Sequence, residues 1–326
     1  MIKTISLGIE STAHTIGIGI VNDKGNILAD QRAMYKPKKG KGIHPREAAE
    51  HHYEYIVNLI KQVLKEAKLD FKDIDIISYA KGPGLPNCLQ VGTVMARYLA
   101  FKYKKKLIPI NHCIAQIEIG KLATECKDPV VLYCSGGNTQ VIAFTEGKYR
   151  IFGETEDIPV GNAFDVLARH FNLEMPGGPK IDKLAEKGKY VEIPYVVKGM
   201  DLSFSGILTE CKRLYNKKIK KEDIAFSFVE TCFSMLTEVT ERALAHTNKK
   251  EVLLVGGVAA SPKLKEMVNI MCSERNAKCF SVPKEYSGDN GVMIAWNGIL
   301  ASKNKNIKDY SFDKDWRTDE VDVNWL

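Results

Sequence analysis

The feature that most limits what this chain can fold into is an internal repeat. Near the N-terminus the apolar runs TISLGI and IGIGIV flank a small polar loop, Glu10–His14, and a turn at 22–25 leads into a third strand-like run, NILADQR. About 125 residues later, PVVLYC and QVIAF flank the loop Ser135–Thr139, and the turn Glu146–Gly147 leads into KYRIFGE. The repeat predicts two copies of one lobe, with a boundary near 128–130.

The segments between and after the two copies alternate in pattern. Residues 45–67 carry apolar side chains at the spacing of an amphipathic helix, and 223–246 reads as a long helix before the apolar strand 251–255. Strands that alternate with helices are typical of α/β layers. We therefore predict an α/β chain of two duplicated RNase-H-like lobes, 1–128 and 129–326, with a nucleotide cleft between them. The length of 326 residues suits two domains.

Composition excludes several classes of protein. No apolar run approaches the ~18 residues of a membrane span, and the N-terminus lacks the layout of a signal peptide, so we expect a cytoplasmic protein with no membrane partner. The eight cysteines form no CxxC pair, which argues against zinc fingers and thioredoxin chemistry, and we expect most of them to be reduced and buried. The excess of 47 Lys and Arg over 40 Asp and Glu permits a polyanionic partner without requiring one.

Three loops share one chemical character, because each follows an apolar strand and consists of small residues with exposed backbone N–H groups. They are Gly8–Thr12, Ser135–Thr139 with Gly136, Gly137 and Asn138 at its centre, and Gly256–Ala260, which opens on Gly256 and Gly257. Glycine lets a ligand approach the backbone, and clustered N–H dipoles attract anions. We expect these loops to hold a nucleotide phosphate; an ordinary strand-ending turn is the alternative for each. The absence of a Walker A sequence and of GxGxxG argues against P-loop and Rossmann folds.

Two acidic residues near further glycines are candidates for contact with a nucleotide. Asp182 follows the stretch Pro176–Pro179, which contains Gly178, and a carboxylate in such a place often accepts hydrogen bonds from a ribose. The equal alternative is an acid favoured by the dipole at the start of a helix. Asp165 lies inside a helical stretch, where a solvent-facing acid is the alternative.

His112 is the candidate metal ligand with the most informative context. It stands after a strand at the start of a helix, so Gln116, four positions on, shares its face. The local sequence alone favours an ordinary polar residue at a helix start over a ligand. Asp289 stands at the mouth of another helix, where an N-cap is the alternative. The adjacent His51 and His52 point about 100° apart on a helix, and we assign them to the surface or an interface.

A series of ordered motifs extends over essentially the whole chain. They are LGIESTAHT (7–15), KGPGLPNCLQVG (81–92), NHCIAQIEIGK (111–121), LYCSGGNTQV (132–141), FGETEDIPVGNAFD (152–165), PGGPKID (176–182), DLSFSG (201–206), LLVGGVAAS (253–261) and SGDNGVMIAW (287–296). Together they resemble the universal tRNA threonylcarbamoyladenosine transferase family, the catalytic subunit of the archaeal and eukaryotic KEOPS complex, once labelled sialoglycoprotein endopeptidases. The archaeal branch is the most similar.

This resemblance implies the two-lobed actin-like ATPase fold shared with heat-shock chaperones and sugar kinases. It implies an acyltransferase that moves threonylcarbamoyl from threonylcarbamoyl-AMP, an adenylate, to the exocyclic amine of the adenosine beside the anticodon. One divalent metal per subunit, iron by resemblance with zinc or magnesium as alternatives, would be held by His112, Gln116, Tyr133 and Asp289. The adenylate would contact Tyr133, Cys134, Ser135, Gly136, Gly137, Asp165, Gly178, Asp182 and Ser261.

Three positions depart from the family pattern. Gln116 stands where the family has a second histidine, Asp182 where it has glutamate, and Ser261 where it has asparagine. An amide oxygen in place of imidazole moves the site toward hard cations and weakens iron or zinc. A catalytically impaired nucleotide-binding scaffold is therefore the rival hypothesis, and a sugar kinase is a third, although no feature marks its base. Positioning and electrostatic stabilisation should dominate the transfer; Glu10 is a candidate general base, with a local structural role equally open.

Partners also follow from the resemblance. They are tRNA, a small atypical kinase or ATPase subunit, a small dimerising subunit, an accessory tRNA-binding subunit and a separate threonylcarbamoyl-AMP synthase. Helices of the first lobe, including 45–67, are plausible docking faces. We further predict that the basic clusters Lys36–Lys41, Lys102–Lys106 and Lys217–Lys221 add salt-sensitive affinity for tRNA.

Overall fold

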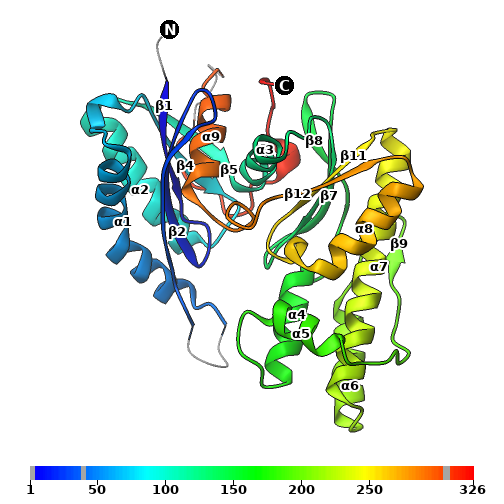
Figure 1. Cartoon of the computed structure of the whole chain (residues 1–326). Helices are drawn as coiled ribbons and strands as arrows, with labels where there is room; N and C mark the ends of the chain where they lie inside the picture. The colour runs from blue at the N-terminus through cyan, green and yellow to red at the C-terminus, as the bar shows by residue number, and fades with distance from the viewer. Residues whose placement is uncertain (1–3, 38–41, 304–308) are drawn as a thin grey trace. The chain divides into compact units, whose positions relative to one another are not determined.

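The computed structural model describes residues 4–37, 42–303 and 309–326 (Figure 1). The chain divides into two compact units, each of which contains one five-stranded sheet. The first unit runs to Leu122 and also includes 146–149 and the C-terminal residues from 288 onward; the second comprises 123–145 and 150–287.

The sheet of the first unit has the order β3-β2-β1-β4-β5. Its strands are β1 (Ile5–Glu10), β2 (Thr15–Asn22), β3 (Ile27–Met34), β4 (Ile76–Gly82) and β5 (Lys106–Asn111). The first three strands form an antiparallel meander, whereas β4 runs parallel to both β1 and β5. The carboxyl ends of β1, β4 and β5 therefore share one edge of the sheet.

Helices cover both faces of this sheet. They are α1 (Pro45–Ala67), α2 (Pro86–Tyr103), α3 (His112–Thr124) and α9 (Gly291–Ala301), with 3₁₀ turns η1 (Phe71–Asp73) and η3 (Thr318–Glu320). Helices α1 and α2 lie on one face and α9 on the other (Figure 1). The alternation of side chains along β1 explains this arrangement, because Leu7 and Ile9 enter the core with α1 and α2, whereas Gly8 faces α9. A Cβ on Gly8 would lie 2.2 Å from the backbone N of Ala295, so only glycine permits so close an approach.

The sheet of the second unit repeats this topology in the order β12-β11-β6-β7-β8. Its strands are β6 (Val130–Cys134), β7 (Thr139–Thr145), β8 (Lys148–Glu154), β11 (Glu251–Val255) and β12 (Lys278–Ser281), and a separate pair is formed by β9 (Val197–Lys198) and β10 (Asp201–Leu202). The helices are α4 (Val160–His170), α5 (Gly177–Ala185), α6 (Ser205–Asn216), α7 (Lys221–Thr247), α8 (Pro262–Glu274) and the 3₁₀ turn η2 (Val258–Ala260). Strand β6 is antiparallel to β7, and β11 is parallel to both β6 and β12.

The shared topology confirms the predicted duplication and the α/β fold class. Residues 45–67 form a helix as predicted, and 251–255 form a strand. The division into units differs from a single boundary at 128/129, because residues 288–326 return to the first unit, where α9 packs on β1, β2 and β4. All eight cysteines are free thiols, and all but Cys279 are buried, as the sequence predicted. No helix among the described residues is long and apolar enough to cross a membrane.

The assignment of His52 to the surface or an interface is wrong. Its side chain is fully buried on the inward face of α1, and burial, with the adjacent His51, lowers its pKa to about 4. His51 is half-buried and stacks on Tyr55 at a ring separation of 4.6 Å. The two histidines differ because consecutive helical positions lie on either side of the boundary between the buried and the exposed face.

Candidate active site

The first cluster of candidate residues lies at the carboxyl edge of the first sheet. Strand β1 ends at Glu10, and strand β5 ends at Asn111 immediately before α3 begins with His112. Gln116 lies one turn further along α3, and Asp289 comes just before α9. Three segments far apart in the sequence therefore meet at this edge, where α/β sheets commonly bind ligands.

The imidazole of His112 lies between two carboxylates. Its Nδ1 is 2.9 Å from Glu10 Oε2, and its Nε2 is 3.5 Å from Asp289 Oδ1. Because an ionised carboxylate only accepts hydrogen bonds, Nδ1 carries the proton toward Glu10. The second oxygen of Glu10 accepts hydrogen bonds from the backbone N of Thr12 at 2.7 Å and from its hydroxyl at 2.5 Å. Glu10 is fully buried, so its carboxylate fixes the ring of His112 and turns Nε2 toward Asp289.

The electrostatics of this cluster follow from its two carboxylates. Burial by itself would lower the pKa of His112, but the charge and hydrogen bond of Glu10, together with the charge of Asp289, raise it to about 9. Without another cation at this point, His112 therefore carries the positive charge that balances the surrounding acids.

Gln116 and His14 complete the surroundings of Asp289. Gln116 Nε2 donates to Asp289 Oδ1 at 3.2 Å, and its Oε1 is buried without a hydrogen-bonding partner in the described part of the chain. His14 Nδ1 lies 4.0 Å from Asp289 Oδ2. The sequence analysis assigned no role to His14, and it placed Thr12 only in a loop expected to hold phosphate; both residues stand in the polar loop after β1.

The donor set at this edge fits a divalent cation. Two ligands of one ion lie ~3.0–3.4 Å apart when each metal–ligand distance is ~2.1 Å, close to the spacings of His112 Nε2 and Gln116 Nε2 from Asp289. A half-turn of the Gln116 amide presents its orphaned oxygen instead of its N–H. Within the described residues no three His, Cys, Asp or Glu side chains form a group that could hold a metal, so a third donor from this unit would have to be another group, such as the predicted Gln116 amide. One imidazole, one carboxylate and one amide suit a hard cation.

The second unit carries two of the three predicted loops of small residues, at the matching edge of its sheet. Strand β6 ends at Cys134, and the Ser135 hydroxyl accepts hydrogen bonds from the backbone N–H groups of Gly137 at 3.3 Å and Asn138 at 3.0 Å. A Cβ on Gly136, Gly137 or Gly257 would meet no atom within 4 Å, so the space beside these loops is open. Gly256 has φ +94°, and a Cβ there would lie 2.3 Å from the carbonyl of Cys134, so this position requires glycine.

Further candidates stand on the helices of the second unit. Asp165 Oδ1 accepts a hydrogen bond from the backbone N of Gly177 at 2.8 Å, so this carboxylate joins α4 to the start of α5. Asp182 lies on α5, close to Ser261, which is the residue before α8. Burial raises the pKa of Asp182, and the nearby Ser261 hydroxyl opposes this rise. Asp182 Oδ1 and Ser261 Oγ are both buried without a hydrogen-bonding partner of normal geometry among the described residues. Buried polar atoms of this kind bond to ordered water or to a polar ligand.

Tyr133 and Gly178 are the remaining predicted residues. Tyr133 is fully buried on β6, and Gly178 has open space beside its Cα in the first turn of α5. Both belong to the second unit. The part of Tyr133 in holding a metal stays a prediction.

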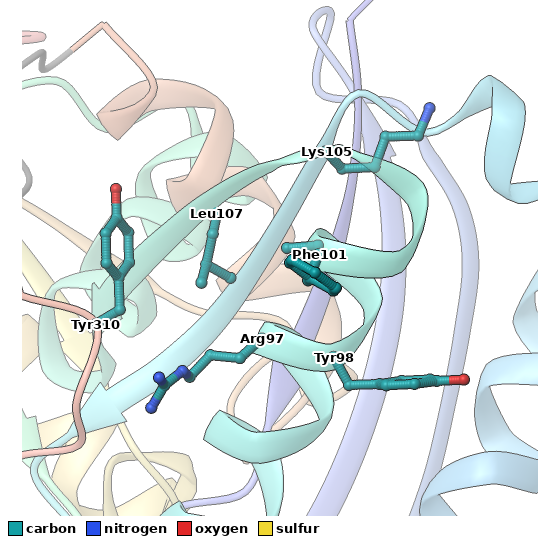
Figure 2. A pocket seen from close by; sticks show the side chains of 7 residues that line it. Arg97, Tyr98, Phe101, Lys105, Leu107 and Tyr310 are labelled. Atoms are coloured by element: carbon teal, nitrogen blue, oxygen red, sulfur yellow. The ribbon is translucent and has the colours of Figure 1, made fainter.

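A separate pocket of about 550 Å³ contains none of the predicted metal-binding or nucleotide-binding residues, although Lys105 of the predicted basic cluster lines it. It is lined by side chains of α2, of β5 and the turn before it, and of the C-terminal segment. They are Arg97, Tyr98, Ala100, Phe101, Lys105, Leu107 and Tyr310 (Figure 2). Its walls offer aromatic rings and two cations but no carboxylate, so it lacks the acid–base and metal-ligand groups of the two edges described above.

Comparisons with known proteins identify relatives of this chain. The family model of tRNA N6-adenosine threonylcarbamoyltransferase matches residues 25–296. A relative of that name from Thermococcus sibiricus is 53% identical, over 98% of this chain and 100% of its own length. The relative from Archaeoglobus fulgidus, of the same name, is 51% identical over 98% of this chain and 99% of its own. A probable bifunctional tRNA threonylcarbamoyladenosine biosynthesis protein of Methanocaldococcus jannaschii is also 53% identical, but this chain spans only 60% of it.

Solved structures with low sequence identity share the fold. HypF of T. kodakarensis superposes over 92% of this chain and 48% of its own with a TM-score of 0.63 at 16% identity. The activator of 2-hydroxyisocaproyl-CoA dehydratase from Clostridium difficile, with bound ADPNP, superposes over 94% and 100% with a TM-score of 0.52 at 12% identity.

The duplicated sheets place the chain in the class of proteins with the actin-like ATPase fold. Within that class, the relatives from T. sibiricus and A. fulgidus are transferases that modify tRNA. The chain belongs to the tRNA N6-adenosine threonylcarbamoyltransferase family.

Proposed function

We propose that this chain is a working threonylcarbamoyl transferase, with a divalent cation at the edge of the first sheet and the adenylate donor at the glycine loops of the second. The observation that carries the proposal is the orientation of His112, whose Nδ1 is held by buried Glu10 while Nε2 turns to Asp289. Metal-binding histidines are commonly oriented by a carboxylate in this way.

The reaction requires little acid–base chemistry from the protein. The nucleophile is N6 of the adenosine, and it attacks the carbonyl carbon of the threonylcarbamoyl group. The new N–C bond forms, the bond from that carbon to the phosphate oxygen breaks, AMP leaves with the electron pair and N6 gives up a proton. Because adenine delocalises the N6 lone pair while AMP is a good leaving group, positioning of the two reactants and stabilisation of charge are the main demands.

We assign the first demand, positioning of the reactants, to residues of the second unit. The open backbone around Gly136, Gly137 and Gly257 gives the phosphate a place beside N–H dipoles. Asp182 Oδ1 and Ser261 Oγ are neighbouring buried polar atoms without a hydrogen bond of normal geometry in the described chain, and they suit ribose hydroxyls.

We assign the second demand, stabilisation of charge, to residues of the first unit. His112 Nε2, Asp289 and the Gln116 amide oxygen would hold the cation, with Tyr133 predicted as a further ligand. When bound, a divalent cation polarises the oxygens of the threonylcarbamoyl group as a Lewis acid. Glu10 has both oxygens engaged, by His112 and by Thr12, which supports a positioning role rather than the general base expected as one alternative.

One observation favours the rival hypothesis, a scaffold that binds nucleotide without catalysis. The Gln116 N–H group occupies Asp289 Oδ1, an oxygen that a cation would need. In an active enzyme the amide must turn over on metal binding, whereas in a scaffold it would stay as it is.

The partners named in the sequence analysis are part of the proposal. Exposed apolar side chains support docking on α1 and α2: Tyr53 is 78% exposed and Val57 47%, while Val94 and Phe101 on α2 are 59% and 88% exposed. Exposed apolar side chains that lie together on a surface often mark a contact with another protein. We propose that one of the KEOPS-type partner subunits covers them, and that the assembly works in the cytoplasm.

The test is transfer of labelled threonine to tRNA. The purified chain is combined with a threonylcarbamoyl-AMP synthase, the partner subunits, ATP, bicarbonate, ¹⁴C-threonine and unmodified tRNA, with Mn²⁺, Mg²⁺, Fe²⁺ or Zn²⁺ supplied separately. Label in tRNA above the reaction lacking this chain supports the transferase. Adenylate binding without label under every metal supports the scaffold and overturns the proposal.

A further inference from the structure

The C-terminal strap, residues 309–326, follows a long path over the first unit. At the end of β4 the backbone N of Asp313 donates to the Lys81 carbonyl at 2.9 Å, and the Lys81 ammonium lies 2.6 Å from Asp309. The strap passes so close that a Cβ on Gly82 would lie 1.7 Å from the Asp313 carbonyl oxygen. This glycine, at the end of β4, is the residue that lets the strap reach the edge of the sheet.

Beyond this point the strap contacts Asn111, the residue that precedes His112. Asn111 Oδ1 accepts hydrogen bonds from the backbone N–H groups of Cys113 at 3.0 Å and Ile114 at 3.2 Å, so it caps the start of α3. Its Nδ2 donates to the carbonyl of Trp316 at 3.1 Å. One buried amide therefore joins the first turn of α3 to the strap.

A second attachment lies further along the same helix. The buried carboxylate of Glu118 accepts hydrogen bonds from Trp325 Nε1 at 3.1 Å and from the Tyr149 hydroxyl at 2.7 Å. The strap is itself secured there, because the backbone N of Val323 donates to the carbonyl of Gly147 at 3.0 Å. Along a helix, positions 111 and 118 are separated by ~10 Å, and His112 and Gln116 both lie between them.

We propose that the C-terminal strap is a positioning device for α3, and that Asn111 and Glu118 are the positioning residues through which it sets His112 and Gln116 against Asp289. A helix held at one end can still rotate about its axis or tilt, whereas one held at both ends presents its side chains in a single orientation. Asp289 is carried by the segment before α9, so the strap fixes one donor group of the cation site relative to another. The inference about the cation rests on the proposed function; the inference about α3 does not.

Two conservative variants remove one attachment each. Asn111→Asp keeps the oxygen that caps α3 but replaces the N–H group that reaches Trp316. Trp325→Phe keeps an aromatic ring and loses only the N–H donor to Glu118. Tyr310→Phe is the matched control, because Tyr310 belongs to the strap but lines the separate pocket on α2.

The first measurement is Co²⁺ binding to the full chain, followed by visible absorption. For each of the two variants we expect an affinity three- to tenfold lower than that of wild type, and shifted absorption bands, whereas the control matches wild type. The second measurement is hydrogen exchange of the α3 amides in the metal-free protein, where both variants should exchange at least fivefold faster than the control.

The two measurements separate the possible failures. If the wild-type protein binds no Co²⁺, the proposed cation site fails, and the exchange data alone decide the role of the strap. Unchanged exchange in α3 for both variants overturns the positioning device, whatever the cobalt result. Faster exchange throughout the first unit, rather than in α3, also overturns it, because the contacts would then serve general stability.

Discussion

Glu10 offers the sharpest test of how the first edge works. Glu10→Gln keeps the shape of a fully buried side chain, but removes its charge and leaves an amide that cannot accept hydrogen bonds at both ends. Either the bond from His112 Nδ1, at 2.9 Å, or those from Thr12 must be lost. Loss of the carboxylate that orients a metal-binding histidine typically lowers metal affinity ~10–100-fold, or ~1.4–2.7 kcal/mol. We expect this loss for Co²⁺ or Mn²⁺.

The assay measures metal affinity by titration and the rate of transfer at increasing metal concentration. If Glu10 positions His112, saturating metal restores the rate constant of Glu10→Gln to within about threefold of wild type. Glu251→Gln is the control, since Glu251 accepts backbone hydrogen bonds from Lys127 and Asp128 in the second unit, and its metal affinity should not change. Unchanged affinity with a rate reduced ~100-fold or more at saturating metal would refute the reasoning and identify Glu10 as the general base.

Three further predictions follow from the site and from its supports. Gln116→His should raise affinity for Zn²⁺ or Fe²⁺ at least tenfold over wild type and leave Mg²⁺ binding weaker, measured by competition titration; equal affinities would show that residue 116 does not contact the ion. Asp157→Asn should lower the free energy of unfolding by about 1 kcal/mol at pH 7, because Asp157 accepts from the backbone N–H groups at the start of α6. Burial opposes ionisation of Asp157, but these hydrogen bonds lower its pKa below the ordinary value of 3.8, so its contribution is present above pH ~4 and is lost as pH falls below 3.8; a deficit in denaturant melts that stayed constant down to pH 2 would contradict this. Replacing Lys217, Lys218 and Lys220 by Gln should weaken tRNA binding and reduce its salt slope by about two to three, and an unchanged slope would mean that the cluster is merely solvated.

The structure reduces the number of lysines in the predicted basic clusters that are available to bind phosphate. The ammonium groups of Lys105, Lys106 and Lys221 are engaged with backbone carbonyls, so they contribute less to a phosphate-binding surface than their positions in the sequence imply. Residues 38–41 of the cluster Lys36–Lys41 lie outside the described part of the chain.

Much of the fold and of the candidate site could be predicted from local patterns in the sequence. The short apolar runs in TISLGI and IGIGIV indicate β1 and β2, which are buried along their whole length. The small residues after β6 and β11 indicate the open loops around Gly136 and Gly257. Such features are visible in sequence because backbone geometry and burial act on neighbouring residues. The duplicated order of strands made the common edge of each sheet predictable as well.

Long-range pairings were not visible in the same way. The contact of Glu10 with His112 joins residues separated by 102 positions, and the bond from Trp325 to Glu118 joins residues separated by 207. No local pattern specifies either partner. The return of 288–326 to the first unit escaped prediction for the same reason, because α9 packs against Gly8 only once the sheet exists.

The most direct test of the account is the mass of the nucleoside formed in a single-turnover reaction. Purified chain loaded with its metal, in its complete assembly, is mixed with threonylcarbamoyl-AMP and unmodified tRNA, and the digested tRNA is analysed by mass spectrometry, alongside Asp289→Ala at equal concentration. The account predicts N6-threonylcarbamoyladenosine with the wild-type chain and a yield at least ~100-fold lower with the variant. Equal yields would contradict the proposed cation site, and no product from the wild-type chain would contradict its activity as a transferase.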